Sequence, residues 1–246
     1  MGLDMIKNKI NYFIFFFLLK NTCALAHIDE NNFQMLTKQI IDLYVTQISN
    51  LYKNSTIFIK PSYNINSSLI QDSVFYVKDE NKFIITITGE LARQKMINQP
   101  ALGIIICHEI GHILGGYPKQ TSFHQSWSSV EGQADYFATN TCMKNINMIF
   151  WQDNLYNFDQ EIIQKCEYHY QNLVDFIGCL RTASGIVSLQ NYFNSKSLLF
   201  KPISLHNKDT HQVNKTLQKY PSNQCRIDTF WAGLFNEAKP KCWYKE

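Results

Sequence analysis

The sequence has little charge, no internal repeat and no pair of cysteines spaced as C-x-x-C. Its 246 residues are 17% charged, 45% hydrophobic and 14% aromatic, with a formal net charge of +3. This composition is that of an ordinary globular protein and suggests neither disorder nor a fibrous repeat. Because no C-x-x-C pair is present, we do not expect a cysteine-ligated structural zinc site.

The N-terminus has the pattern of a secretory signal peptide. Two lysines precede an apolar run over residues 10–19, and an A-x-A cleavage sequence ends at Ala26. Ten residues are too few to cross the roughly 30 Å core of a bilayer, so we expect a signal peptide over 1–26 and no stable membrane span afterwards. The remaining residues, 27–246, should form one secreted or periplasmic domain.

Removal of the signal peptide leaves an almost neutral chain. It takes away three lysines and one aspartate, so that 20 basic and 19 acidic residues remain, a net charge of +1. A neutral protein has no electrostatic basis for binding nucleic acid or an anionic membrane. We therefore expect no nucleic-acid partner.

Export would also place the remaining cysteines in an oxidising compartment. The mature chain has six of them: Cys107, Cys142, Cys166, Cys179, Cys225 and Cys242. An even number suggests disulfides, although six cysteines allow 15 pairings. Cys225 and Cys242 are close in sequence and are a candidate pair. Cys107, in the apolar part of a predicted helix, is equally compatible with a buried free thiol.

The hydrophobic pattern predicts an α+β fold, with a small mixed sheet packed on a mostly helical body. Apolar residues at helical spacing predict a helix over 28–53. Runs rich in β-branched residues predict strands at 57–59, 74–77 and 83–88, the last two forming a hairpin. In 83–88 threonines alternate with isoleucines, which is typical of an edge strand.

Proline, glycine and capping residues predict where the main helices begin and end. One helix should begin near Pro100 and end at Gly115, and the next should be capped by Ser126 or Ser128 and reach about Lys144. Further helices are expected over residues 90–98, 162–177, 180–193 and 225–237. No linker interrupts the chain, so a single domain is expected.

A His-Glu-x-x-His motif occupies residues 108–112 of the first of these helices. Residues four apart lie on one face of a helix, so His108 and His112 can bind one metal ion together. Glu109 lies one residue further round and can take a proton from a metal-bound water. This combination is the signature of zinc peptidases.

Catalytic zinc usually takes three protein ligands, which leaves one to be found. Glu131 lies 19 residues after His112, on the next predicted helix, beyond a glycine-rich turn. Asp135 follows on the same helical face and can accept a hydrogen bond from a ligating histidine. Taken alone, these two acids would indicate an exposed acidic helix face. Their spacing from His112 favours a third ligand and its supporting carboxylate.

These five residues resemble the pattern of gluzincin metallopeptidases and match it one for one. The order of strand, metal helix and Glu-x-x-Ala-Asp is most similar to the HtpX-like, CAAX-prenyl-protease-type branch, over about residues 74–142. The integral-membrane members of that branch have transmembrane helices, so this chain would be a soluble, exported relative. The resemblance implies a zincin-like domain in which 83–88 is the edge strand that binds extended substrate.

The stretch from Tyr220 to Asp228 resembles the late His-Pro…Arg element of the same family, with tyrosine in place of histidine. Only Arg226 is carried over, as a salt-bridging support of the site. A donor for the oxyanion is also expected. The sequence leaves five candidates for it: His124, His206, His211, Tyr220 and Arg226.

The sequence therefore predicts an enzyme, a metalloendopeptidase that uses Zn²⁺ and acts on a protein or peptide substrate. Glu109 would be the general base that activates the attacking water and then passes the proton to the departing amine. The alternative is a catalytically silent, zinc-containing binding protein of the cell envelope.

Overall fold

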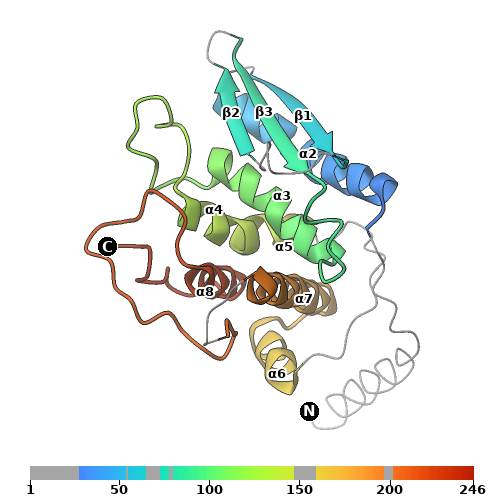
Figure 1. Ribbon diagram of the computed structural model, residues 1–246, viewed down its shortest axis with the longest axis vertical. Helices are drawn as coiled ribbons and strands as arrows, with labels where there is room; N and C mark the ends of the chain where they lie inside the picture. Colours follow the sequence, from blue (N-terminus) through green and yellow to red (C-terminus); the bar gives the residue numbers. More distant parts are fainter. Residues whose placement is uncertain (1–27, 54, 65–72, 78–79, 147–158, 197–201) are drawn as a thin grey trace.

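The computed structural model describes residues 28–53, 55–64, 73–77, 80–146, 159–196 and 202–246. The predicted signal peptide lies outside this part of the chain. A small sheet lies at one end of the molecule and a body of helices at the other (Figure 1). One main apolar core contains residues from both.

The sheet has three strands in the order β1-β3-β2, where β1 is Thr56–Ser62, β2 is Ser73–Val77 and β3 is Lys82–Thr88. β1 runs parallel to β3, and β2 pairs with β3 antiparallel. The predicted mixed sheet and hairpin are therefore confirmed. The prediction that 83–88 is the edge strand is wrong, because β3 lies between its two neighbours.

The threonines of β3 explain this error. Thr86 and Thr88 are only 6% and 3% exposed, so the alternation of threonine and isoleucine does not mark a face in contact with solvent. A hydroxyl-bearing β-branched side chain suits a covered strand as well as an edge. The edges of the sheet in the described strands are β1 and β2.

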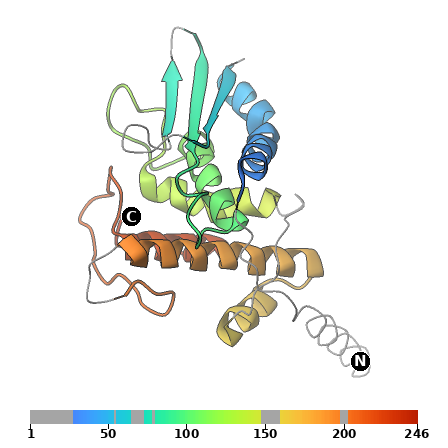
Figure 2. The same ribbon diagram turned by 45° about the vertical axis from the view of Figure 1, so that its right-hand side comes forward.

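The first helix, α2 (Glu30–Leu51), is the amphipathic helix that the sequence predicts. The side chain of Asp29 caps it by accepting a hydrogen bond from the Asn32 amide. Its apolar face packs against β1 and the central helix, and Figure 2 shows it beside β1.

The central helix, α3 (Gln99–Leu114), carries the His-Glu-x-x-His motif and is buried along nearly its whole length. Pro100 lies in its first turn, as predicted, and Asn98, which was expected to end a preceding helix, caps it. The helix expected over 90–98 is absent, and hydrogen bonds from Gln94 to Leu91 and from Ile97 to Gln94 close separate turns there. The Asn98 amide donates to Ser188 Oγ instead of to a preceding turn.

The next helical stretch begins later than the sequence predicts. α4 (Glu131–Phe137) continues into a π-helical turn, η1 (Ala138–Cys142), and then into α5 (Met143–Ile146). No side-chain hydrogen bond caps α4 at Val130. The expected caps, Ser126 and Ser128, are wrong because both lie in the loop before it. Ser128 Oγ is 3.3 Å from His112 Nδ1 instead.

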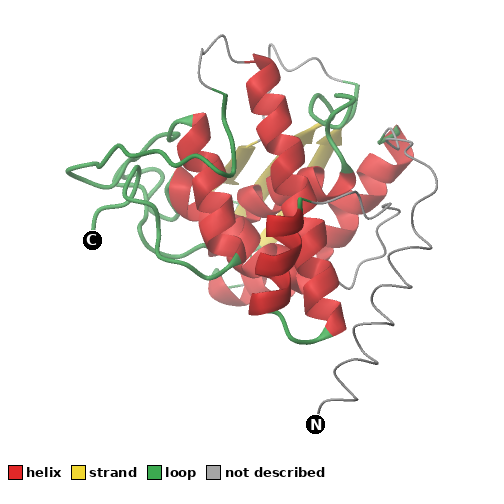
Figure 3. Cartoon of the chain, turned by 90° about the horizontal axis from the view of Figure 1, so that it is seen from below, coloured by secondary structure: helices red, strands yellow, loops and turns green. Residues whose placement is uncertain are grey.

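Three further helices complete the body: α6 (Gln160–His169), α7 (Leu173–Lys196) and α8 (Asn223–Leu234). Seen from below, helices cover the sheet (Figure 3). The break between α6 and α7 lies at residues 170–172, where Asn172 accepts a hydrogen bond from the Asp175 amide. We predicted the break at 178–179, but glycine is tolerated inside a buried helix.

All six cysteines of the predicted mature chain form disulfides: Cys107–Cys142, Cys166–Cys179 and Cys225–Cys242. The candidate pair of the last two cysteines is confirmed, and Cys107 is not a free thiol. Three disulfides fit an extracellular or periplasmic protein. In the part of the chain that the structure describes, no helix has the length and apolar character needed to cross a membrane.

Candidate metal centre

The three predicted ligands, His108, His112 and Glu131, converge from α3 and from the first residue of α4. One nitrogen of each histidine and one carboxylate oxygen lie within 4.8 Å of one another, so the group could hold a metal ion. Glu131 Oε2 is 3.2 Å from His108 Nε2 and 3.5 Å from His112 Nε2. Both histidines are almost fully buried, and Glu131 is 15% exposed.

A glycine in the motif allows the two helices to approach closely enough for this. A Cβ atom on Gly111 would lie 2.9 Å from both Cα and O of Ala134 and 3.2 Å from the Phe137 ring. No side chain fits there without movement of α3 or α4. Gly111 therefore lets α4 lie directly against the face of α3 that carries the histidines.

The outer ring nitrogens of both histidines are held by hydrogen bonds. His108 Nδ1 is 2.7 Å from Asp135 Oδ1, and His112 Nδ1 is 2.9 Å from the backbone carbonyl of Ser129. With Nδ1 protonated in both rings, each Nε2 has its lone pair free toward the cluster. The spacing of Asp135 from the motif predicts its contact with a ligating histidine, whereas no sequence pattern predicts the Ser129 carbonyl, because any residue can supply a backbone oxygen.

Arg226 lies behind Asp135 and pairs with it through a two-bond fork. Arg226 Nε donates to Oδ2 and Nη2 to Oδ1, both at 2.8 Å. Burial would raise the pKa of Asp135, but the Arg226 guanidinium and His108 lower it, so the carboxyl stays ionised. The salt bridge predicted for Arg226 is thus present, and its partner is the carboxylate that orients His108.

The cluster has the electrostatics of a cation site. Burial alone would lower the pKa of His108, but Asp135 and then Glu131 and Glu109 raise it to about 10. Burial would likewise raise the pKa of Glu131, but the close approach of the two histidine rings lowers it. The carboxylates around the two rings therefore favour a positive charge between them, carried by a proton or by a metal ion.

The inward-facing atoms are those that a metal ion would satisfy. His108 Nε2 and Glu131 Oε2 are buried and make no hydrogen bond within the described residues. Unpaired buried polar atoms are rare and costly. Four tetrahedral ligands at about 2.1 Å from a metal lie about 3.4 Å apart, close to the 3.2 and 3.5 Å found here. The residues present fit a metal ion.

Tyr220 is the candidate for the oxyanion donor that the structure brings to the cluster. Its ring lies 6.3 Å from that of His108 at an interplanar angle of 16°, and the Arg226 guanidinium lies 5.0 Å above it. Burial first, and then the charges of Glu131 and Glu109, raise the pKa of its hydroxyl. The phenol therefore stays protonated and able to donate.

Three of the other four candidates have side chains engaged elsewhere. His206 lies between Asp159 and Glu161, and His124 packs on Phe123 in the loop between α3 and α4. The guanidinium of Arg226 is committed to Asp135 as described above. The described hydrogen bond of His211 is made by its backbone amide, to Asp209, and does not involve the ring.

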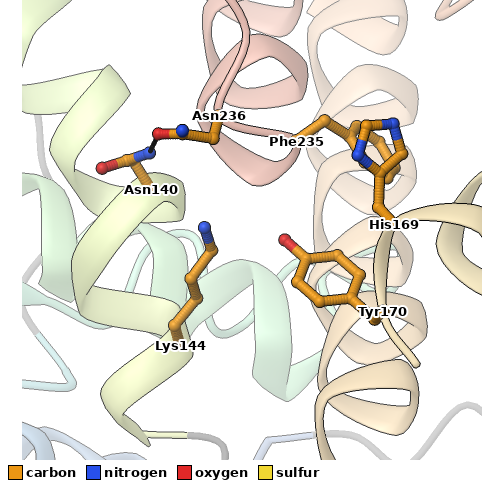
Figure 4. Close-up of a pocket in the computed structure, with 6 residues that line it drawn as sticks. All are labelled: Asn140, Lys144, His169, Tyr170, Phe235 and Asn236. Carbon is orange, nitrogen blue, oxygen red and sulfur yellow. Dashed lines mark hydrogen bonds between the residues drawn. The ribbon is translucent and has the colours of Figure 1, made fainter. Parts of the chain in front are cut away.

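A separate hollow of about 490 Å³ lies where the ends of α6 and α8 meet α5. Figure 4 shows the Lys144 amine and the Tyr170 hydroxyl pointing toward it. Six residues line it: Asn140, Lys144, His169, Tyr170, Phe235 and Asn236. It shares no residue with the metal cluster and lacks a carboxylate, so it is a different feature of the surface.

No family model matches the sequence, and comparison with curated proteins and with solved structures found no match. The argument for the site therefore depends on its own geometry.

Proposed function

We propose that the chain is a zinc-dependent endopeptidase with a zincin-like domain, a soluble exported relative of the HtpX-like gluzincins. The observation that carries this proposal is the convergence of one ring nitrogen each from His108 and His112 and one carboxylate oxygen of Glu131 within 4.8 Å. Glu109, one residue after the first ligand, is 97% buried and acts electrostatically on His108.

The donor set favours zinc among the common metals. Two imidazole nitrogens and one carboxylate oxygen are the ligands of catalytic zinc in many hydrolases, where the fourth position is left to water or substrate. The carboxylate that orients His108 and the carbonyl that orients His112 are the supporting contacts such sites need. Cysteine is absent from the set, since Cys107 is committed to Cys142.

The mechanism assigns one role to each residue. A bound zinc ion would supply Lewis acidity, which lowers the pKa of water to about 7 and polarises the scissile carbonyl. Glu109 takes a proton from the attacking water as its oxygen bonds to the carbonyl carbon. It then gives that proton to the nitrogen as the C–N bond breaks, so that a carboxylic acid and an amine are released.

Tyr220 supplies the oxyanion donor in this proposal. Its ring contacts both His108 and Arg226, and among the residues that the structure describes no hydrogen-bond partner occupies its hydroxyl. A preorganised, unoccupied donor at this position can bond to the carbonyl oxygen when that oxygen becomes negative.

Extended substrate would add to the free edge of the sheet as a further strand. The resemblance implied β3 for this role, but β3 is central. β2 is the edge strand that packs near α3, whereas α2 packs against β1. We therefore assign substrate binding to β2, whose outer backbone groups are paired with no other described strand.

Two variants test the proposal. Metal analysis of the purified wild type should give one zinc per chain, lost in His112→Ala. Glu109→Gln should keep the zinc but abolish cleavage of a peptide library, because an amide cannot accept the proton. Unchanged cleavage by Glu109→Gln contradicts the mechanism. A wild type that binds zinc and cleaves nothing favours the silent binding protein instead.

A further inference from the structure

Gly132, which follows the third ligand Glu131, has no side chain, and the ring of Trp243 fills the space where one would lie. A Cβ atom on Gly132 would overlap the indole ring of Trp243, because its ideal position lies only 2.5 Å from Cε3. Trp243 is fully buried. The ring therefore lies directly on the backbone of α4, next to Glu131.

This contact belongs to a second apolar cluster, separate from the main core. Its buried members are Val130, Cys225, Cys242 and Trp243. Val130 precedes Glu131 and has no side-chain hydrogen bond that caps α4. The start of the helix that presents the ligand is thus held on two sides. Backbone hydrogen bonds from Ser129 to His112 and from Val130 to Pro118 hold it on the α3 side, and packing against the segment 240–245 holds it on the other.

Two kinds of bond hold that segment in place. The Trp243 carbonyl accepts a hydrogen bond from the Leu217 amide at 2.9 Å, and the Lys241 carbonyl accepts one from Val213 at 3.0 Å. The covalent link is the Cys225–Cys242 disulfide, which closes a separation of 17 residues.

The other end of this disulfide also borders the centre. Cys225 immediately precedes Arg226, which pairs with Asp135 and so supports His108. One cystine therefore lies beside the support of two ligands: Arg226 at one end and Trp243 at the other.

We propose that the segment 240–245, closed onto α8 by Cys225–Cys242, is a clamp that holds Glu131 in its ligating position, with Trp243 as the positioning residue. The proposal rests on the metal-binding part of the proposed function and not on peptidase activity. It predicts that loosening the clamp speeds release of the metal, because a ligand whose backbone can shift leaves the metal more often.

The test compares two disulfides of similar span. Cys225→Ser/Cys242→Ser opens the clamp, whereas Cys166→Ser/Cys179→Ser removes the link between α6 and α7, which closes 13 residues and touches no ligand. The two losses should have similar general effects on stability. We measure transfer of zinc to a colorimetric chelator and the visible absorption spectrum of the Co²⁺ form, which reports coordination geometry.

Opening the clamp should speed zinc release by about 10- to 100-fold and alter the Co²⁺ spectrum, while the matched variant stays near wild type. Trp243→Ala should behave like the opened clamp, and Trp243→Phe should restore slow release in part. Equal release from the two disulfide variants, or wild-type release and spectrum in folded Trp243→Phe and Trp243→Ala proteins, overturns the clamp.

The measurements distinguish failure of the clamp proposal from failure of the proposed peptidase function. A wild type that binds no metal overturns the clamp and the metal centre together. A wild type that binds zinc without cleaving peptides overturns the peptidase alone, and the release rates still decide whether the clamp exists.

Discussion

Gly111 lies so close to Ala134 that a Cβ atom on Gly111 would be 2.9 Å from the Ala134 Cα. In an exposed helix, replacement of glycine by alanine would stabilise the protein by about 1 kcal/mol. Here the added methyl group must push α4 away from α3. We expect Gly111→Ala to lower the free energy of unfolding by about 1–3 kcal/mol and to weaken metal binding. Urea unfolding and metal titration measure the two effects, and unchanged metal affinity would show that the close approach is not needed.

The hydroxyl of Tyr220 should act on turnover and not on metal binding. Tyr220→Phe keeps the ring that stacks on His108 and carries the Arg226 guanidinium. We expect kcat to fall by about 100-fold or more, with KM and zinc content little changed. Steady-state kinetics on one peptide substrate measure this split. Tyr168→Phe, at a side chain 80% exposed on α6, is the matched control, and equal kcat values in both variants would exclude Tyr220 as the oxyanion donor.

The buried Asp135–Arg226 pair should show strong coupling. Asp135→Asn leaves a buried guanidinium without its counter-charge, and Arg226→Met leaves a buried carboxylate that keeps only its bond to His108, so each should cost about 3–5 kcal/mol. The double variant should cost less than the sum, because it removes both charges. Urea unfolding of the four proteins gives the coupling energy. The exposed Lys38–Asp42 pair on α2 should couple by only about 0.3–0.5 kcal/mol, and additivity at Asp135 and Arg226 would contradict the assignment.

Tyr170 should make folding sensitive to alkaline pH. Burial and the charge of Asp175 raise its pKa to about 12, above about 10 in an unfolded chain. The folded protein therefore prefers the protonated phenol, which donates to the Leu234 carbonyl. This stability is fully present below about pH 10 and is lost as the pH rises toward about 12.

The measurement compares the free energy of unfolding of wild type and Tyr170→Phe across that pH range. The variant should be less stable at neutral pH and should lose less stability on alkalinisation. Tyr168→Phe should keep the wild-type slope. Parallel curves for wild type and Tyr170→Phe would contradict the raised pKa.

Local sequence patterns predict much of the fold and most residues of the candidate site. The strands, α3 and the disulfide between the last two cysteines could be predicted, because hydrophobic period, caps and sequence proximity are local properties. The position of β3 could not, since the pattern of a strand records which faces are covered and not which neighbours pair with it. The break at residues 170–172 could not be predicted, because the apolar pattern continues through it and hides the role of Asn172 as a cap.

The candidate ligands could be predicted from the sequence for the same reason, whereas the contacts that hold them could not. Glu131 and Asp135 follow the motif at a readable spacing. The contact of Trp243 with Gly132, in contrast, joins segments far apart in sequence. The residues around Gly132 do not show which side chain packs on it. Tyr220 could be named as one of five oxyanion candidates, but only tertiary packing places its ring on that of His108.

The distance in sequence between Asp135 and Arg226 has a consequence for the order in which the centre is assembled. Asp135 is synthesised 91 residues before Arg226, and Trp243 follows later still. A growing chain therefore contains all three candidate ligands long before it contains the groups that hold them. Under the proposed function, stable metal binding would accompany completion of the chain and its oxidation, and would not begin on the emerging motif.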